Sequence, residues 1–363
     1  MAHEIEAALT GWFGDRLGLD PDSVVLAIEK PRTGFSADTL LVTVDGRRRA
    51  SSFGGEYVVR MERPGRHTFL GSSIVKQARM IRQLRENGVA APAVIGVEPD
   101  AGLAGGSFLA MERVRGHALP QHPSYHVAGF LQGLSEDARR RCWLDALSAI
   151  ASINSLPWRE QFAFLHDDMF GAPGLDSYLA WLAAWRDEAC GGRAHPVVDA
   201  AIARLRRERP EHAACELLWG DSNPGNVLFN DDGAVAAVLD FEAAAIGPAE
   251  IDLSWWFFID SMLAAGQSAP PGIPSRSEQI AAFEAALGRP VRDLAYYDLL
   301  SSVRMALVMA RLGLLLVQDG VLPPRNNAWR ANPAALRVAE LTGSPADQDL
   351  DDYWELVRLM NER

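Results

Sequence analysis

The segment from Leu218 to Leu253 constrains the fold of this chain more than any other part of its sequence. It contains two short apolar runs, at 227–229 and 234–239, separated by the turn residues Asn-Asp-Asp-Gly. Residues of these types tolerate the left-handed backbone of a tight turn, and two apolar runs around such a turn predict a β-hairpin. The hairpin returns the chain, so we expect residue 240 to lie roughly opposite residue 226.

Acidic and amide side chains flank the predicted hairpin. Asp221 is followed five positions later by Asn226, and Asp240 comes directly after the second apolar run. Amide and carboxylate oxygens suit Mg²⁺, so Asn226 and Asp240 are expected to bind one ion between them. Asp221 lies on the loop before the first strand, one short loop away from that ion. A base, a metal-binding amide and a metal-binding carboxylate, in this order, are typical of a phosphoryl-transfer site.

Each of these residues has a simpler explanation when taken alone. Asp and Asn are common in loops, and a hairpin with acidic ends is usually a solvated turn. The complete set is more specific, because it combines the predicted hairpin with five fixed positions: Gly220, Asp221, Asn226, Asp240 and Asp252. We therefore interpret the segment as catalytic.

These residues resemble the catalytic core of the aminoglycoside phosphotransferase family, which is distantly similar to protein kinases. Members typically carry His-Gly-Asp-x-x-x-x-Asn, a hairpin, an Asp-x-Glu or Asp-x-Asp, and an Asp-Leu downstream. The resemblance implies that Asp221 is the catalytic base, that Asn226 and Asp240 hold Mg²⁺, and that Glu242 is an accessory acidic group. It also implies that Asp252 braces the catalytic loop.

The sequence departs from the family pattern at Trp219, which stands where the family usually has His. In related kinase folds that position is mostly structural. We therefore expect Trp219 to support the catalytic loop, and the departure concerns the packing of that loop more than its chemistry.

The remaining chain predicts an α+β, two-lobed, protein-kinase-like fold. An N-terminal helix is expected at 2–17, and a second helix at 72–87 follows the third strand of a small antiparallel sheet. Five strands are predicted in that lobe, at 24–28, 39–44, 57–61, 93–97 and 107–111. Helices of a larger lobe are predicted at 140–156, 177–190, 197–207, 277–287, 293–316 and 351–363. The expected division is a nucleotide-binding lobe at 1–111, a hinge at 112–117 and a mainly helical lobe at 118–363 with the catalytic loop and acceptor site.

The nucleotide end of the site carries weaker signals. Gly34 and Ser36 lie between the first two strands, where backbone amides and a hydroxyl can donate to phosphates, although a single Gly there also fits an ordinary hairpin loop. Arg60 stands on the third strand, where kinases place a Lys that pairs with phosphates, and we favour this role over the alternative of a surface strand residue. Gln77 falls where kinases have the Glu that orients this cation.

The stretch Met-Glu-Arg-x-x-Gly at 111–116 resembles the hinge that family members often carry. By that resemblance, Met111 and Arg113 are expected to contact the nucleotide. A second hypothesis remains open: the protein is a catalytically weak pseudokinase that binds a nucleotide or a partner. It is supported by the single glycine of the phosphate loop, by Arg60 and by Gln77. The intact Asp221 set argues against it.

Composition bounds the partners and the compartment. The 363 residues carry a net charge of −12, so binding to nucleic acid through phosphates is not expected. Three widely spaced cysteines predict neither a disulfide framework nor a zinc site. The amphipathic, acidic N-terminus is unlike a signal peptide, and the apolar stretch 303–317 is too short and too charged to span a membrane. We expect a cytoplasmic protein of undetermined oligomeric state.

The leading hypothesis is therefore an O-phosphotransferase that uses Mg²⁺ with ATP or GTP and a small-molecule hydroxyl acceptor. Aminoglycosides, macrolides, choline-like alcohols, sugars and hydroxyacyl thioesters all remain open as acceptors. Trp255 and Trp256 are candidates for the wall of an acceptor pocket, although core packing is the simpler explanation for aromatics in a helical lobe. The acidic residues there are scattered: Asp187, Glu188, Asp260 and Glu278.

Overall fold

The chain forms two compact units in a computed structural model that describes residues 2–30, 38–48, 51–62, 64–264 and 266–361. Unit 1 comprises Met1–His67 and Gly71–Arg115, and unit 2 comprises Thr68–Leu70 and Gly116–Arg363. Each unit has its own core and is described separately below.

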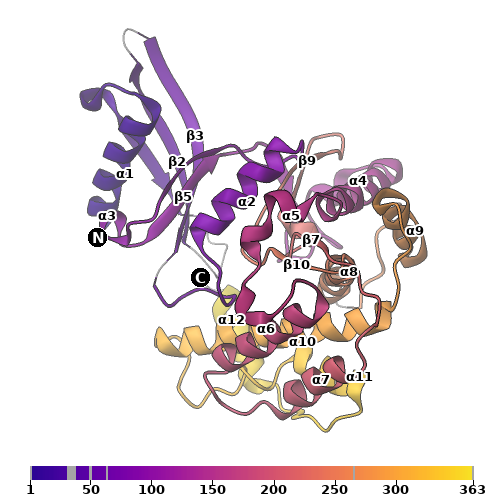
Figure 1. The fold of residues 1–363 in the computed structure, drawn as a ribbon. Helices are drawn as coiled ribbons and strands as arrows, with labels where there is room; N and C mark the ends of the chain where they lie inside the picture. Colours follow the sequence, from indigo (N-terminus) through magenta and orange to yellow (C-terminus); the bar gives the residue numbers. More distant parts are fainter. Residues whose placement is uncertain (1, 31–37, 49–50, 63, 265, 362–363) are drawn as a thin grey trace. The chain divides into compact units, whose positions relative to one another are not determined.

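Unit 1 is built on a five-stranded antiparallel sheet with the strand order β1-β2-β3-β5-β4 (Figure 1). The strands are β1 (Val25–Glu29), β2 (Asp38–Arg48), β3 (Ser51–Glu62), β4 (Val94–Glu98) and β5 (Ser107–Glu112). The predicted number of strands is confirmed. β2 and β3 are longer than predicted, because their polar ends continue to pair from Asp38↔Met61 as far as Arg48↔Ser51.

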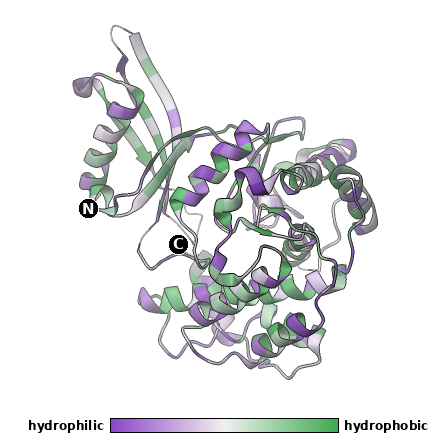
Figure 2. Cartoon of the chain, in the orientation of Figure 1, coloured by the Kyte–Doolittle hydropathy of each residue, from purple (hydrophilic) through white to green (hydrophobic). Residues whose placement is uncertain are grey.

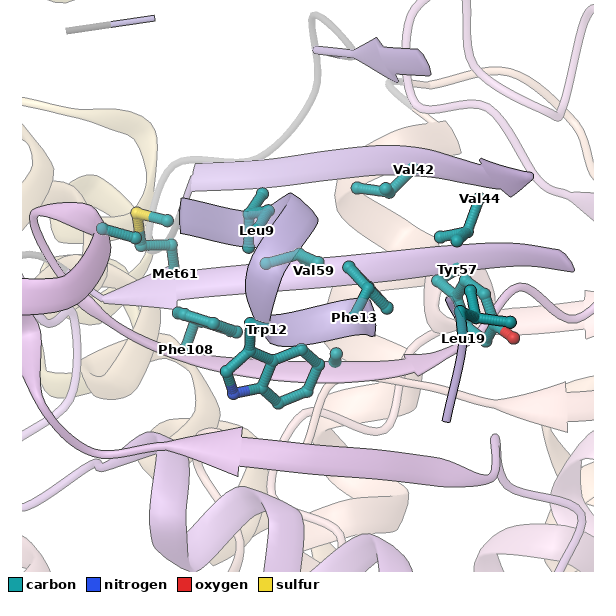
Figure 3. Close-up of a cluster of buried hydrophobic side chains, with 12 residues drawn as sticks. Leu9, Trp12, Phe13, Leu19, Val42, Val44, Tyr57, Val59, Met61 and Phe108 are labelled. Carbon is teal, nitrogen blue, oxygen red and sulfur yellow. The ribbon is translucent and has the colours of Figure 1, made fainter. Parts of the chain in front are cut away.

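Helix α1 (Ala2–Leu17) closes the core of unit 1. Its Leu9, Trp12 and Phe13 are buried against alternate residues of the strands, such as Val42 and Val59 (Figure 3). Alternate positions share one face of a strand, which explains this pattern. The N-terminal helix predicted from the sequence therefore serves as one layer of the small unit.

Helix α2 (Ile74–Glu86) follows β3 and begins at Ser73, whose side chain accepts a hydrogen bond from the backbone N–H of Lys76. Hydrophilic and hydrophobic residues alternate along it (Figure 2), and the apolar face buries Ile74, Ala78 and Leu84. A short helix, α3 (Ala101–Ala104), precedes β5.

Unit 2 is mainly helical. Its longer helices are α4 (Glu136–Asn154), α6 (Leu175–Ala189), α7 (Pro196–Arg207), α8 (Glu250–Ala264), α9 (Arg276–Leu287), α10 (Leu294–Gln318), α11 (Pro333–Thr342) and α12 (Asp351–Asn361). A single turn, α5 (Trp158–Gln161), follows α4. Six of these eight longer helices correspond to predicted ones; α8 and α11 were not predicted.

Helix α10 is the central helix of unit 2 and contacts α6, α7, α8 and α11. It is long and apolar enough to cross a membrane by length and composition alone, but most of it is buried inside the unit. The structure therefore shows α10 as a core helix, as expected, but the helix has 25 residues, so the expectation from residues 303–317 that it is too short to span a membrane was wrong.

Two small sheets carry the catalytic segment. Strands β8 (Val227–Phe229) and β9 (Val235–Val238) form the predicted hairpin, and β6 (His117–Ala118) pairs with β8. In the second sheet, β7 (Glu216–Leu218) pairs with β10 (Ala245–Gly247). The catalytic loop joins β7 to β8, and the segment after β9 leads into β10, so both segments are fixed at both ends.

Residues 68–70 pack within unit 2 although they lie between β3 and α2 in the sequence. The indole N–H of Trp185 donates to the carbonyl oxygen of Thr68 at 2.8 Å, and that of Trp181 donates to Leu70 at 2.9 Å. The ring of Phe69 lies 5.0 Å from that of Trp185. Packing of this segment therefore accounts for both tryptophans of α6.

Candidate active site

The hairpin brings Asn226 and Asp240 to the same end of β8 and β9. Val227 pairs with Val238, and the N–H of Leu239 donates to the carbonyl oxygen of Asn226 at 2.9 Å. Asp240 follows immediately and has a left-handed backbone with φ = 62°. A non-glycine residue in this region is strained, and such strain occurs often at functional sites.

Asp221 is held by two side chains, one on each carboxylate oxygen. The amide nitrogen of Asn226 donates to Oδ2 at 2.6 Å and to the carbonyl oxygen of Asp221 at 3.0 Å. The indole N–H of Trp255 donates to Oδ1 at 2.7 Å. The carboxylate orientation is therefore set from both sides, by the catalytic loop and by α8.

The charge environment of Asp221 is unusual. Burial raises the pKa of its carboxyl group, and the neighbouring Asp240 carboxylate raises it further, against the hydrogen bonds from Trp255 and Asn226 and the charge of Arg304. Two carboxylates that repel each other in this way are a suitable environment for a divalent cation.

The ligand set fits Mg²⁺. Because the amide nitrogen of Asn226 donates to Asp221, its Oδ1 is the side-chain atom left for a metal, and Asp240 supplies a carboxylate. No group of three or more His, Cys, Asp or Glu side chains forms a metal cluster among the described residues. Mg²⁺ needs no such cluster, since it commonly takes one or two carboxylates together with substrate phosphates.

The backbone of the catalytic loop is shaped by its own polar residues. The side-chain oxygen of Asn223 accepts from the N–H of Gly225 at 3.0 Å, and its amide nitrogen donates to the carbonyl oxygen of Asp221 at 3.2 Å. The hydroxyl of Ser222 donates to the carbonyl oxygen of Asp252 at 2.8 Å. These bonds make a compact turn around Pro224.

Gly220 brings the catalytic loop into contact with the segment after Asp240. Its φ is +87°, and a Cβ atom there would lie 1.9 Å from the carbonyl oxygen of Ala243. Any larger residue would push the two segments apart, which explains a Gly directly before Asp221.

Trp219 also joins the catalytic loop to the segment that carries Asp240. Its side chain is fully buried, and its indole N–H donates to the carbonyl oxygens of Leu239 at 2.9 Å and Asp240 at 3.1 Å. A ring N–H at this position thus holds the backbone that carries Asp240. This contact is a physical explanation for Trp219 in place of the usual His.

Asp252, at the start of α8, lies at the centre of a buried network. Its carboxylate accepts from the backbone N–H groups of Trp219 at 2.8 Å and Gly220 at 2.9 Å, and from the side-chain amide of Asn154 at 2.8 Å. Burial raises the pKa of the Asp252 carboxyl, while these donors and Arg304 oppose the rise. Asp252 thus joins α8 to the backbone of Trp219 and Gly220 and to Asn154.

Arg304 of α10 lies beside this network. It is fully buried, its guanidinium donates to the carbonyl oxygen of Gly220 at 2.5 Å, and its central carbon lies 4.3 Å from the centroid of the Trp255 ring. Arg304, Trp255 and Asn154 were not predicted as site residues. The available signal was a charged residue inside a long apolar helix, which is rarely buried without a role.

Two of the residues expected to bind the nucleotide, Arg60 and Gln77, lie in β3 and α2 of unit 1. Arg60 lies on β3 opposite Thr39 and Leu109. Gln77 is buried, and its amide lies 3.4 Å from Oε1 of Glu62 and 3.4 Å from the hydroxyl of Ser72. Glu62 also accepts from the N–H of Ile74 at 2.9 Å.

Glu62 is therefore the carboxylate beside α2, and it was not predicted from the sequence. It stands two positions after Arg60 on β3, so the two side chains share one face of the strand. That alternation was the signal that could have identified it.

The other expected nucleotide contacts lie at the end of β5 or outside the described residues. Met111 is nearly buried in β5, and the guanidinium of Arg113 lies 3.4 Å from the Glu56 carboxylate. Gly34 and Ser36 fall in 31–37, outside the described residues. In unit 2, Glu242 is partly buried, two residues after Asp240.

The aromatic and acidic acceptor candidates are already engaged. Trp255 is 2% and Trp256 0% exposed, so both rings belong to the core and do not wall an open pocket. The four acidic candidates each have a polar partner: Asp187 with Arg186, Glu188 with Arg311, Asp260 with Tyr125 and His126, and Glu278 with Ser275 and Arg140.

Fold and site together define a small-molecule phosphotransferase with a protein-kinase-like fold. The chain belongs to the phosphotransferase enzyme family, whose sequence model matches residues 27–300. The family resemblance inferred from residues 218–253 is therefore confirmed.

Solved structures show the same fold at low sequence identity. One, from Ralstonia eutropha JMP134 and provisionally assigned as an aminoglycoside phosphotransferase, is 22% identical with a TM-score of 0.65, covering 94% of this chain and 99% of that chain. The ethanolamine kinase of Plasmodium vivax is 12% identical with a TM-score of 0.56, covering 88% and 82%. A macrolide 2'-phosphotransferase from Brachybacterium faecium is 17% identical with a TM-score of 0.52, covering 94% and 99%.

Proposed function

We propose that the protein transfers the γ-phosphoryl group of ATP or GTP to a hydroxyl group of a small molecule, with Asp221 as the base. The single observation that carries this proposal is the arrangement of Asp221, Asn226 and Asp240. The side-chain amide of Asn226 donates a hydrogen bond to Asp221 at 2.6 Å. The Asp240 carboxylate is close enough to raise the pKa of the Asp221 carboxyl group. Base and metal ligands thus form one site, as phosphoryl transfer requires.

Asp221 orients the acceptor hydroxyl and accepts its proton. The acceptor oxygen forms a bond to the γ-phosphorus as the bond from that phosphorus to the bridging oxygen breaks, which releases the nucleoside diphosphate. Asn226 and Asp240 would hold Mg²⁺, with Glu242 as an accessory acidic group, and such an ion would supply positive charge to neutralise the phosphates. Trp219 and Asp252 keep the loop in place while this happens.

In unit 1, Arg60 binds the nucleotide phosphates, and Gly34 and Ser36, which lie outside the described residues, are proposed to donate to the same phosphates. Met111 and Arg113 contact the nucleotide at the end of β5. Arginine remains charged and can bind phosphate oxygens in a bidentate manner, so it is suited to the position.

The departure at Gln77 does not remove the acidic group from this region. Glu62 lies 3.4 Å from the Gln77 amide, so a carboxylate is present beside α2 in a different position. This favours an active enzyme over the pseudokinase hypothesis. A thermal-shift titration separates the two: an enzyme is stabilised by ATP or GTP in a Mg²⁺-dependent manner, whereas no Mg²⁺-dependent stabilisation would favour the pseudokinase.

The availability of carboxylates in unit 2 restricts how many positive charges the acceptor can carry. A polycationic aminoglycoside needs a cluster of available carboxylates, and the four acidic candidates of unit 2 already have polar partners. We therefore favour an acceptor with at most one positive charge, such as a macrolide, a choline-like alcohol, a sugar or a hydroxyacyl thioester. We also propose that the reaction takes place in the cytoplasm, because that reducing compartment keeps the three free thiols reduced.

The proposal is tested by a transfer assay with radiolabelled γ-phosphate, run with ATP and with GTP in the presence of Mg²⁺. The acceptors are a panel of hydroxyl-bearing metabolites and antibiotics, including at least one aminoglycoside. We expect a labelled product with one class of acceptor, and none from the Asp221→Ala variant. Transfer retained by a folded Asp221→Ala protein would overturn the assignment of the base.

A further inference from the structure

Trp255 makes a direct contact with the proposed base. Its indole N–H donates to Oδ1 of Asp221 at 2.7 Å, while Oδ2 accepts from Asn226 at 2.6 Å. Since each oxygen is held by a different N–H, the carboxylate cannot rotate without breaking a hydrogen bond. Asn226 comes from the loop itself, but Trp255 comes from α8 and is an independent point of support.

The Trp255 ring is buried and packs against Phe258 and Arg304. It is 2% exposed, stacks on Phe258 at 5.9 Å with an interplanar angle of 12°, and lies 4.3 Å from the guanidinium carbon of Arg304. A cation over an indole ring is attracted to its π-system and withdraws electron density, which strengthens the ring N–H as a donor.

Arg304 is an unusual residue for a core position. It is 0% exposed, and its Nε and one terminal nitrogen are buried without a hydrogen-bond partner in the described part of the chain. It donates to the Gly220 carbonyl oxygen and lies over the Trp255 ring, and its charge also acts on the carboxylates of Asp221 and Asp252. Burial of a guanidinium with so few donors satisfied is costly, so a buried arginine at this position points to a role other than packing.

We propose that Trp255 and Arg304 act as a positioning pair for Asp221. Trp255 fixes the direction of the Asp221 carboxylate, and Arg304 fixes Trp255 and the carbonyl group of Gly220, the residue directly before the base. In this proposed role, neither Trp255 nor Arg304 touches a substrate. The proposal rests on the proposed function, because it assumes that Asp221 must be aligned with an acceptor. An alignment error of about 1 Å can reduce a rate about 100-fold.

The test compares Trp255→Phe with Trp256→Phe. Both rings are buried neighbours in α8, but the Trp256 indole donates to Gln279 and makes no contact with Asp221. We expect Trp255→Phe to lower kcat about 10- to 100-fold with little change in KM for the nucleotide, and Trp256→Phe to stay within about 2-fold of the parent protein. Equal losses in both variants would overturn the positioning role.

Arg304 is tested in the background of Trp255→Phe. Arg304→Lys keeps the charge but removes the guanidinium group that lies over the Trp255 ring, and thermal melting shows whether the variant folds. If Arg304 acts through Trp255, the substitution lowers kcat less in Trp255→Phe than in the parent protein. Independent, additive losses would overturn the coupling between the two residues.

A spectroscopic readout separates this inference from the proposed function. In protein labelled with ¹⁵N at the tryptophan indoles, the signal lost in Trp255→Phe identifies Trp255. We expect that signal to shift in Asp221→Asn, while the signal assigned through Trp256→Phe stays in place. An unmoved Trp255 signal would overturn the contact even if the enzyme is active. A shift in a protein that transfers no phosphate to any acceptor or to water would instead overturn the proposed function, and with it the catalytic part of the inference.

Discussion

The indole nitrogen of Trp219 lies 2.9 Å from the carbonyl oxygen of Leu239, and this hydrogen bond joins the catalytic loop to the end of β9. Both backbones are close at this point, since Gly220 contacts the segment after Asp240. The bond therefore controls the separation between Asp221 and Asp240.

Trp219→Phe is expected to lower stability by about 1–3 kcal/mol, because two buried carbonyl oxygens lose their indole donor. It should also lower kcat, since Asp240 is then less well fixed. The measurements are urea unfolding and the steady-state rate with Mg²⁺ and nucleotide.

Trp143→Phe is the matched control for that change. Trp143 is equally buried, but its indole N–H has no hydrogen-bond partner among the described residues. The control should therefore cost less stability than Trp219→Phe and leave kcat close to its original value. Equal effects on kcat would show that the loss comes from ring packing and not from the N–H group.

Asp252→Ala is expected to be among the most destabilising changes in unit 2. It leaves the N–H groups of Trp219 and Gly220 and the amide of Asn154 without their acceptor, in a region with no exposure. We expect a loss of about 3–5 kcal/mol in the free energy of unfolding. Asp298→Ala is the control, because that carboxylate pairs with Arg276 at the surface and should cost about 1 kcal/mol or less. Similar losses in both variants would contradict the bracing role of Asp252.

Restoring the residue that kinases usually have at position 77 should weaken this protein. Gln77→Glu places a second carboxylate about where the amide now lies, 3.4 Å from Oε1 of Glu62. We expect a loss of stability and a higher KM for the nucleotide, because like charges repel in a buried site. The double variant Gln77→Glu/Glu62→Gln removes the repulsion and should recover much of both. A single Gln77→Glu variant that binds the nucleotide more tightly would contradict this explanation.

His195 predicts an acid-dependent component of stability. Its side chain is fully buried beside Trp329, and burial lowers the pKa of the imidazole from 6.5 to about 4, against the neighbouring Asp199. Between these two values the unfolded chain binds a proton that the folded protein does not. The contribution is therefore fully present above pH 6.5 and is lost as the pH falls toward 4, by about 3 kcal/mol.

The measurement is urea unfolding between pH 7 and pH 4 for the parent protein and for His195→Phe, which keeps an aromatic ring but cannot titrate. The parent protein should lose about 3 kcal/mol more than the variant across this range. His212→Gln, at an exposed position, should follow the parent curve. Parallel curves for the parent protein and His195→Phe would contradict the assignment.

The sequence was sufficient where local rules determine the structure. The hairpin after Asn226 follows from two apolar runs and one turn, and the strands of unit 1 follow from alternation. The position of Asp240 beside Asn226 needed only the hairpin and its register. These features depend on near neighbours in the chain, so they could be predicted without knowledge of the tertiary fold.

The parts that were missed depend on contacts between distant residues. Helix α8 is apolar on nearly all sides because it is buried, so it lacks the 3.6-residue pattern that identifies a surface helix. Helix α11 is short, and its signals were the cap at Asn332 and the proline that follows. No local sequence pattern encodes how α8 and α10 pack. That packing determines the contact of Trp255 with Asp221 and the contact of Arg304 with the carbonyl oxygen of Gly220.

The central claim is that Asp221 is the base of a Mg²⁺-dependent phosphoryl transfer. It is tested most directly by the rate of γ-phosphate release from ATP and from GTP, with and without Mg²⁺, for the parent protein and for Asp221→Asn in parallel. We predict Mg²⁺-dependent turnover by the parent protein and a loss of at least about 100-fold in the variant, with nucleotide binding preserved and the fold of the variant checked by thermal melting. Turnover by Asp221→Asn at the parent rate would contradict it.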